Sequence, residues 1–300
     1  MMLRAYFDII FAAQRTLLLA CPLLPIPVRI LHPDEPTPLL EVEHLTISAG
    51  ALGRPLVDAL SFRLSAGETL AVVGESGAGK SLTGLAVLGL LPAPLRLAAG
   101  RIRWQGREIS GLSESARRHL RGGEMAMIFQ EPSAAMNPAI PIGPQIAEVV
   151  RMHRNLDRRE ARARAIELLD RVHIADPAQR YHAYPHELSG GMLQRAAIAV
   201  AIAGEPRLLI ADEPTTSLDA AVQRGVLELL AEIQSASRMG MLFITHNLAL
   251  VAEMADRALV MRAGCAVEQA DVCTLFAQPE QPYTRELLAA APRLPAPCGA

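Results

Sequence analysis

The sequence predicts an α/β fold with a mixed, mostly parallel core sheet, an antiparallel β subdomain and an inserted helical subdomain. Two observations lead to this prediction. Short apolar runs alternate with stretches of helical character, and one of these runs leads into a glycine-rich loop. Continuous apolar runs of this length are typical of strands that are buried on both faces of a parallel sheet. The four runs are Thr69–Gly74, Met125–Gln130, Leu208–Asp212 and Met241–His246.

The overall composition supports a folded domain and argues against several functional classes. Of the 300 residues, 51% are hydrophobic and 20% are charged, which is enough apolar material for a substantial core. A formal net charge of −2 and an aromatic content of 4% argue against a nucleic-acid-binding protein. The four cysteines include no C-x-x-C pair, so we expect free thiols in a reducing cytosol rather than a disulfide scaffold or a zinc site.

Residues 1–38 differ from the rest of the chain and are predicted to be an N-terminal extension, amphipathic or poorly ordered. A transmembrane helix needs about 20 uninterrupted apolar residues, and Asp8 and Arg15 interrupt the apolar run here. A secretory signal that ends at Cys21 is the alternative, because a basic residue precedes the run. We expect no other segment to span a bilayer.

Residues 39–270 are predicted to form the main domain, and its first strands differ in pattern from the four apolar runs. In three segments apolar and polar residues alternate, which is typical of strands with one exposed face. We therefore expect half-exposed strands of an antiparallel sheet near the front of the domain. The segments are Leu39–Ile47, Ala59–Leu64 and Arg101–Trp104.

The segment Gly74–Ser81 matches the phosphate-binding pattern G-x-x-x-x-G-K-[ST]. It follows a predicted strand and precedes a helical pattern over Leu82–Leu90, which is the context that the motif requires. Backbone N–H groups of such a loop surround phosphate oxygens, and the helix N-terminus adds a positive end. Lys80 is expected to bridge the β- and γ-phosphates, and the Ser81 hydroxyl to ligate Mg²⁺. The predicted cofactor-binding residues of the loop are Gly74, Glu75, Ser76, Gly77, Ala78, Gly79, Lys80, Ser81 and Leu82.

The helical insertion is predicted to span residues from about 131 to 187. Within it, Arg151–Val172 is expected to be one charged helix, with Ile166, Leu169 and Val172 on its apolar side. A cluster of arginines on such a helix is typical of a solvated face rather than of a binding patch.

A pair of carboxylates follows the third apolar run. Asp212 stands at the carboxyl end of that run and Glu213 comes next. In a parallel sheet this position lies beside a phosphate loop on a neighbouring strand. Asp212 is therefore a candidate Mg²⁺ ligand, and Glu213 a candidate general base for an attacking water. The alternative for an isolated pair of this kind is a carboxylate that caps a turn.

The segment Leu188–Arg195 resembles the LSGGQ signature of the ATP-binding-cassette (ABC) ATPases, with methionine in the glutamine position. The other motifs of that family stand around it in the family's order, and the resemblance covers about residues 39–293. It implies the P-loop NTPase fold of ABC ATPases, with ATP and Mg²⁺ as cofactors. The further matching positions are Gln130 in a Q-loop, the Asp212–Glu213 pair, Ser217–Asp219 and His246.

This resemblance implies roles for residues outside the phosphate loop. Ser189, Gly190 and Gly191 would bind the γ-phosphate held by a second ABC ATPase subunit, so that ATP lies between two subunits. Gln130 would contact Mg²⁺ and the catalytic water, and His246 would contact the γ-phosphate. Asp219 would belong to the loop that links the two ATP sites across the dimer.

Finer resemblance points to the importers of dipeptides and oligopeptides. It rests on Glu131–Ser133, Met136–Pro138, Tyr184–Glu187 and Gln281–Leu288, the last in a C-terminal tail over residues 271–300. It implies a peripheral protein on the cytoplasmic face of the inner membrane, with an identical or paralogous ATPase subunit, two membrane permeases and an extracytoplasmic binding protein as partners, and no nucleic acid. Nickel importers carry similar motifs and remain an alternative for the transported substrate.

Two other functional classes remain to be weighed, and one position departs from the family pattern. A soluble ABC ATPase of DNA repair or translation usually joins two cassettes or inserts a long coiled coil, and neither is present here. A catalytically weak regulatory cassette would be expected to lack some of the catalytic residues, which are intact here. Ala49 stands where many relatives place an aromatic residue on adenine, so we expect weaker contact with the base.

Overall fold

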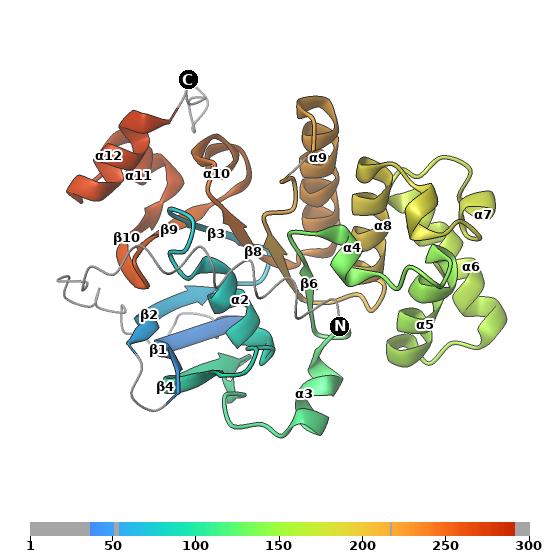
Figure 1. Ribbon diagram of the computed structural model, residues 1–300, viewed down its shortest axis with the longest axis horizontal. Coiled ribbons are helices and arrows are strands. Elements are labelled where there is room, and N and C mark those ends of the chain that lie inside the picture. The colour runs from blue at the N-terminus through green and yellow to red at the C-terminus, as the bar shows by residue number, and fades with distance from the viewer. Residues whose placement is uncertain (1–36, 51–53, 217, 292–300) are drawn as a thin grey trace. The chain divides into compact units, whose positions relative to one another are not determined.

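The structure, a computed structural model, describes residues 37–50, 54–216 and 218–291, and these form two compact units. The first unit takes the described residues up to Arg117 and from Gly240 onward, and the second takes Arg118–Met239 (Figure 1). Apart from residues 37 and 38, the predicted N-terminal extension lies outside the described residues. Among the residues that are described, no helix has the length and hydropathy needed to cross a membrane.

The first unit contains two sheets and their covering helices. Its strands are β1 (Leu40–Ala49), β2 (Pro55–Leu64), β3 (Thr69–Val73), β4 (Leu95–Trp104), β5 (Arg107–Glu108), β8 (Gly240–Thr245), β9 (Arg257–Arg262) and β10 (Cys265–Asp271). Its helices are α2 (Lys80–Leu88), α10 (Leu248–Met254), α11 (Val272–Ala277) and α12 (Pro282–Ala290), and the chain passes into the second unit within α3 (Glu114–Leu120).

The predicted antiparallel sheet is confirmed, with the strand order β2-β1-β4-β5. Opposite Glu41 on β1 stand Arg63 on β2 and Arg103 on β4. The Glu41 carboxylate, only 7% exposed, forms ion pairs of 2.7 Å with Arg63 and 3.0 Å with Arg103. These two partners compensate the burial of its charge. The pairing therefore accounts for a buried acidic residue on this strand.

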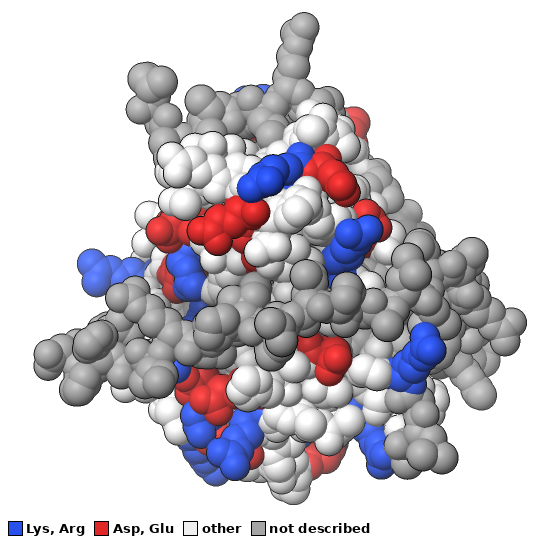
Figure 2. Space-filling model, turned by 90° about the vertical axis from the view of Figure 1, so that its left-hand side faces the viewer, with Lys and Arg blue, Asp and Glu red and all other residues white. Residues whose placement is uncertain are grey.

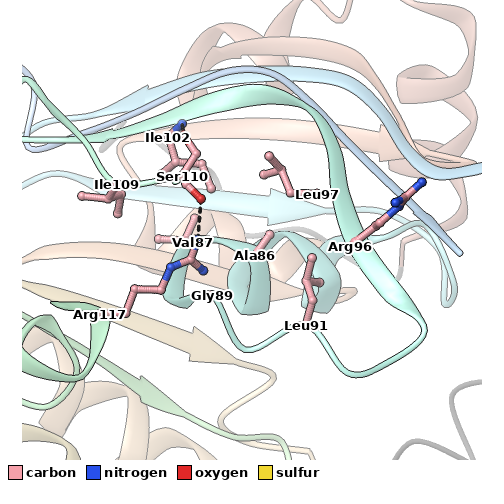
Figure 3. A pocket seen from close by; sticks show the side chains of 10 residues that line it. All are labelled: Ala86, Val87, Gly89, Leu91, Arg96, Leu97, Ile102, Ile109, Ser110 and Arg117. Carbon is pink, nitrogen blue, oxygen red and sulfur yellow. Dashed lines mark hydrogen bonds between the residues drawn. The ribbon is translucent and has the colours of Figure 1, made fainter. Parts of the chain in front are cut away.

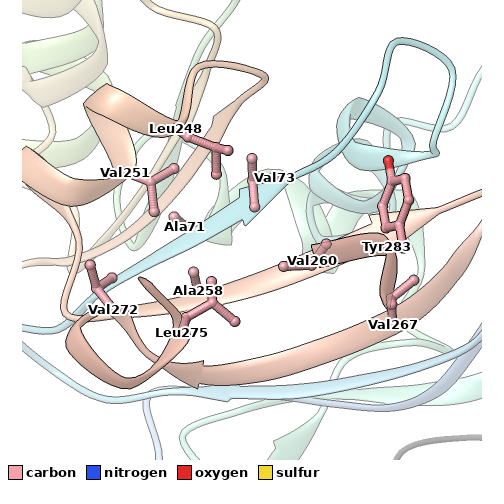
Figure 4. Close-up of a cluster of buried hydrophobic side chains, with 10 residues drawn as sticks. All are labelled: Ala71, Val73, Leu248, Val251, Ala258, Val260, Val267, Val272, Leu275 and Tyr283. Carbon is pink, nitrogen blue, oxygen red and sulfur yellow. The ribbon is translucent and has the colours of Figure 1, made fainter. Parts of the chain in front are cut away.

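In the second sheet of this unit, β3 lies between β8 and β9 and pairs with both in parallel, and β10 is antiparallel to β9. All residues of β3 and β8 are buried, as the apolar runs predicted. Strands β9 and β10 were not predicted from the sequence. Beyond the sheet, α10, α11 and α12 cover a cluster of buried apolar side chains that includes Ala71, Val251 and Leu275 (Figure 4).

A cavity of about 210 Å³ lies at the C-terminal end of α2 (Figure 3). Its wall is part apolar, with Val87 and Ile102, and part basic. The Arg117 side chain lines it and donates a hydrogen bond to the backbone carbonyl of Ser110 (Figure 3). It donates a second hydrogen bond to the carbonyl of Leu112. None of the predicted site residues lines this cavity, which is at the opposite end of α2 from Lys80.

The second unit is mainly helical. Its strands are β6 (Met125–Ile128) and β7 (Leu208–Asp212), which pair in parallel. Its helices are α4 (Pro132–Ala135), α5 (Ile142–Arg154), α6 (Arg158–Arg171), α7 (Pro177–Arg180), the 3₁₀ helix η2 (Pro185–Glu187), α8 (Gly190–Ile202) and α9 (Ala220–Ser237). Helix α8 packs against the helices α4, α5, α6 and α9 and the strand β6, and its Ala-rich sequence allows these neighbours to approach closely.

The single helix predicted over Arg151–Val172 was wrong, because two helices occupy this stretch. Helix α5 ends at Asn155, whose φ of 53° is left-handed. Asp157 then caps α6: its side chain accepts from the N–H groups of Arg159 and Glu160, while the Glu160 side chain accepts from the Asp157 N–H. This capping box starts a new helix and so outweighs the continuous helical composition.

Two further features concern charge and cysteine. On the face shown in Figure 2, acidic and basic side chains of the described residues intermingle rather than gather by sign. This mixture agrees with the small net charge. Cys273 takes part in a disulfide, so the expectation of free thiols was wrong at this position. The absence of a C-x-x-C pair therefore does not exclude a disulfide.

Candidate active site

The predicted phosphate loop joins β3 to α2 and lies against the strand β9. A Cβ at Gly74 would stand 2.1 Å from the carbonyl oxygen of Met261, so only glycine fits here without moving one of the two segments. Gly79 has a φ of 98°, and a Cβ there would come within 2.8 Å of Val57 Cγ2. These glycines therefore allow the loop to curl tightly while the neighbouring backbone touches it.

Lys80 is the first residue of α2 and is only 5% exposed. Its ammonium donates hydrogen bonds to the carbonyls of Gly74 (2.8 Å) and Glu75 (2.9 Å). The side chain thus folds back over the loop rather than toward solvent. Because an ammonium has three donors, it can exchange these carbonyls for phosphate oxygens with little movement of the chain.

The parallel register brings His246 to the same edge of the sheet as this loop. Val73 at the end of β3 pairs with Thr245 at the end of β8. Gly74 follows Val73 and His246 follows Thr245, so these two residues lie side by side at the ends of neighbouring strands. His246 is exposed, and Asn247 after it caps α10 by accepting from the N–H of Ala249 (3.0 Å).

In the second unit, β6 and β7 place Gln130 and Glu213 together. Ile128 pairs with Ala211, and both predicted site residues stand two positions further on. Gln130 Nε2 donates to Glu213 Oε2 at 3.2 Å, although 83 residues separate them in the chain. A hydrogen bond of this kind orients the carboxylate that was predicted to act as general base.

Thr216 is a neighbour of this carboxylate that the sequence reasoning missed. Its hydroxyl donates to Glu213 Oε2 at 2.9 Å. Glu213 itself has a φ of 46°, an uncommon backbone conformation for a residue with a side chain. A threonine three residues after a carboxylate in a tight turn is the signal that could have identified this contact.

Asp212 ends β7 and is 1% exposed. Carboxylate oxygens are the ligand type that Mg²⁺ prefers. The other predicted metal ligands, Ser81 in the first unit and Gln130 in the second, also offer oxygen atoms. Each of these side chains, taken within its own unit, is therefore chemically suited to ligate magnesium.

The predicted signature starts helix α8. Ser189 is its N-cap, exposed, and its hydroxyl accepts from the Met192 N–H at 3.3 Å. Gly190, the first residue of this 13-residue helix, is also exposed. Gly191 has a packing role as well: a Cβ there would stand 2.5 Å from Val222 Cγ1 on α9. Ser189 and Gly190 thus fit an anion contact, and Gly191 also permits close helix packing.

Asp219 is the N-cap of α9. Its carboxylate accepts from the N–H groups of Ala221 (3.1 Å) and Val222 (3.0 Å). Ser217, the other predicted position of this loop, lies outside the described residues. Within the second unit, then, Asp219 stabilises the start of a helix, and any contact with another subunit would be an additional role.

Comparison with known proteins gives consistent matches. The model of the ABC transporter family matches residues 57–216, slightly more than half of the chain. The dipeptide transport ATP-binding protein DppD of Escherichia coli (strain K12) is 46% identical over 256 residues, which cover 85% of this chain and 78% of that protein. DppD of Haemophilus influenzae is 44% identical over 256 residues, with the same coverage of 85% and 78%.

Two solved structures resemble the fold of this chain. CbiO1 from Clostridium perfringens, part of the ABC transporter complex cbiONQ, has a TM-score of 0.70 at 26% identity and covers 85% of this chain and 96% of its own. The ATP-binding cassette MJ0796, a dimer bound to ADP and Pi, has a TM-score of 0.69 at 20% identity, covering 78% of this chain and 98% of its own. The family match over half of the chain, together with relatives that share nearly half of its residues over most of its length, shows that the chain belongs to the ABC transporter family.

Proposed function

We propose that the chain hydrolyses ATP to drive the uptake of di- and oligopeptides, as the nucleotide-binding subunit of an ABC importer. The two DppD proteins are named as dipeptide transport ATP-binding proteins, and they resemble this chain over 85% of its length. Their names support both ATP as the energy source and peptides as the transported substrate.

The observation that carries the proposal is the position of the only lysine. Every other residue of the Lys/Arg class in the 300-residue sequence is an arginine, and the single lysine is Lys80. A chain that uses arginine everywhere else keeps lysine where the side chain must fit among the loop carbonyls. A compact ammonium with three donors fits such a site, whereas a planar guanidinium is larger and has a fixed fork of donors. The choice of lysine therefore follows from phosphate binding.

The catalytic residues of the proposal come from both units. Lys80 and the loop N–H groups hold the phosphates, and His246 contacts the terminal one. In the second unit Glu213, oriented by Gln130 and Thr216, accepts a proton from the attacking water. Such a base is expected to contribute about 10²- to 10⁴-fold in rate.

Magnesium and a second subunit complete the proposed site. Ser81, Asp212 and Gln130 would hold Mg²⁺, which supplies positive charge to the phosphates. The exposed start of α8, with Ser189, Gly190 and Gly191, would contact the γ-phosphate of a partner cassette, and Asp219 would lie at that interface.

The proposal also includes the wider assembly. Residues 39–270 form the nucleotide-binding domain, and its helical insertion spans residues from about 131 to 187. Residues 271–300 form a tail typical of peptide importers. As an importer subunit the chain works with membrane permeases, here two, on the cytoplasmic face of the membrane, and an extracytoplasmic binding protein delivers the peptide.

The first experiment measures MgATP binding and hydrolysis by the full chain and by two variants of its lysine. Lys80→Ala is expected to abolish turnover. Lys80→Arg, which keeps the charge, is expected to weaken binding about ten- to hundredfold, since charged hydrogen bonds to phosphate are lost. Arg164→Lys is the matched control, because Arg164 forms ion pairs with Glu167 and Glu205 and lies outside the proposed site. An unchanged rate in Lys80→Ala would refute the assignment of the phosphate loop.

The second experiment tests transport rather than hydrolysis. The chain is reconstituted in liposomes with its permeases and binding protein, and ATP hydrolysis is measured with and without dipeptides. A peptide importer is expected to show peptide-dependent stimulation. Stimulation by nickel instead of peptide would correct the substrate, and no stimulation in any reconstituted system would favour a soluble ATPase.

A further inference from the structure

The C-terminal helix α12 packs against β10, and one of its side chains joins a buried cluster that also contains the end of the strand leading into the phosphate loop. Its residue Tyr283 is 6% exposed and belongs to the buried cluster that contains Val73 and Val260. Val73 is the last residue of β3, directly before Gly74. In Figure 4 the Tyr283 ring stands upright from the cluster, and its hydroxyl points toward the side on which the chain continues from β3. A residue near the C-terminus of the chain thus shares a buried cluster with the residue directly before the phosphate loop.

Two further contacts define the position of this ring. The guanidinium of Arg262 lies 4.5 Å from the ring centroid, a cation–π arrangement. The Tyr283 hydroxyl is buried and has no partner of hydrogen-bond geometry among the described residues. Burial raises the pKa of this hydroxyl, and Glu75 stands near enough for its carboxylate and its backbone N–H to act on the same pKa. The hydroxyl therefore interacts weakly with the second residue of the loop but forms no hydrogen bond of good geometry among the described residues.

The start of α12 is held firmly, so the ring has a fixed support. The Glu268 carboxylate on β10, 6% exposed, accepts hydrogen bonds from the N–H groups of Glu280 (2.8 Å) and Gln281 (3.0 Å). Arg285 in turn donates to the carbonyls of Pro279 (2.9 Å) and Glu280 (3.0 Å). These bonds fix the turn before α12, and Tyr283 is the second residue of that helix.

The hairpin formed by β9 and β10, which precedes α12 in the chain, also contacts the phosphate loop. Between β9 and β10, the Gly264 N–H donates to the carbonyl of Ala78 in the loop at 3.1 Å. Met261 on β9 approaches Gly74 so closely that no side chain fits there. The segment from β9 to α12 therefore touches the loop near Gly74, Glu75 and Ala78, three of the predicted phosphate-contacting positions.

The Lys80 ammonium connects these contacts to nucleotide binding. It donates to the carbonyls of Gly74 and Glu75, and a bound phosphate competes for the same donors. When the ammonium donates to a bound phosphate instead, the Glu75 carbonyl loses its hydrogen bond from Lys80. The unpaired Tyr283 hydroxyl is the donor placed to hold that segment instead.

We propose that Tyr283 is a positioning residue of the phosphate loop, which holds the Glu75 segment when nucleotide is bound, so that helix α12 sets the affinity for ATP. This inference rests on the proposed nucleotide-binding function of the loop. Tyr283 touches no reacting atom and acts only through Glu75.

The test is the variant Tyr283→Phe in the full chain, which removes the hydroxyl and keeps the ring over Arg262. MgATP affinity is expected to fall about tenfold, the equivalent of one lost hydrogen bond. At saturating ATP, kcat is expected to stay unchanged. Without nucleotide, the Tm is expected to stay equal or rise, because an unpaired buried hydroxyl is removed. A residue of purely structural importance would instead lower the Tm and leave the affinity unaltered.

Two control variants separate this effect from the general loss of a buried hydroxyl. Tyr181→Phe is the matched control: Tyr181 is 8% exposed, has Arg162 at 5.3 Å from its ring centroid and lies in the helical second unit. Thr284→Val removes the buried, unpaired hydroxyl next to Tyr283 on the same helix. Both are expected to bind MgATP as the unaltered chain does.

A double-mutant cycle provides a second measurement. If Tyr283 acts through Glu75, Tyr283→Phe and Glu75→Ala together should weaken MgATP binding by less than the product of their separate effects. Independent effects, or unchanged affinity in Tyr283→Phe, would overturn the inference. If Tyr283→Phe binds normally while Lys80→Ala does not, only this inference fails. If the unaltered chain binds no MgATP, the proposed function fails and the inference with it.

Discussion

Replacing Glu213 by glutamine separates the chemistry of this residue from its structural contacts. Glu213 Oε2 accepts hydrogen bonds from Gln130 Nε2 at 3.2 Å and from the Thr216 hydroxyl at 2.9 Å. The carbonyl oxygen of a glutamine side chain can accept both. The shape of the turn is also preserved, so we expect the free energy of unfolding to change by less than about 1 kcal/mol.

The rate of hydrolysis should respond far more strongly. An amide cannot take the proton of the attacking water, and the loss of a general base costs about 10²- to 10⁴-fold in kcat. This corresponds to roughly 3–5 kcal/mol in the activation barrier. The affinity for MgATP should stay equal or increase, because the positions that hold the phosphates are untouched and hydrolysis no longer empties the site. The resemblance to ABC ATPases further implies that an ATP-bound dimer accumulates.

The assay combines phosphate release, equilibrium binding of MgATP and size-exclusion chromatography with and without nucleotide. The matched control is Glu205→Gln, because Glu205 also has a left-handed φ, of 56°, and lies in the same unit. Its carboxylate forms ion pairs with Arg154 and Arg164 instead. The control should hydrolyse ATP at the unaltered rate. Hydrolysis by Glu213→Gln at the rate of the unaltered chain would refute the assignment of Glu213 as the base.

Three further changes test the packing and electrostatics of the second unit. Gly191→Ala should destabilise it by about 1–3 kcal/mol, since the added Cβ meets Val222 Cγ1 at 2.5 Å, and Val222→Ala in the same chain should restore much of the loss in chemical denaturation. Asp219→Ala should cost about 1 kcal/mol of unfolding free energy by removing the cap of α9; an unchanged denaturation midpoint would contradict the cap. Burial, with the nearby charge of His119, lowers the pKa of His153 below 6.5, so the unfolded chain binds the proton more tightly. Stability should therefore be full above that pH and decrease as the pH falls below it, and His153→Gln should flatten this dependence in thermal unfolding scans.

Much of the fold was predictable because its signals are local. The four buried strands follow from short apolar runs, and each lies within one or two residues of its predicted bounds. Strand β9 was missed because its apolar stretch is only four residues long between two arginines, Arg257 and Arg262. The helix break at Asn155 was also local: the capping box from Asp157 to Glu160 is visible in the sequence, and overall helical composition obscured it.

For the candidate site, too, some features follow from local sequence and others only from the tertiary structure. By itself, the sequence determined which residues carry the chemistry: a glycine-rich loop ending in lysine and serine, and carboxylates directly after a buried strand. Such patterns need only a few neighbouring residues, because backbone conformation and side-chain type act within one turn. Only the tertiary structure decided that Gln130 and Thr216 share one oxygen of Glu213, and that Tyr283 joins the buried cluster that contains Val73. These contacts join segments distant in the chain, and they depend on strand register and helix packing, which no single segment encodes.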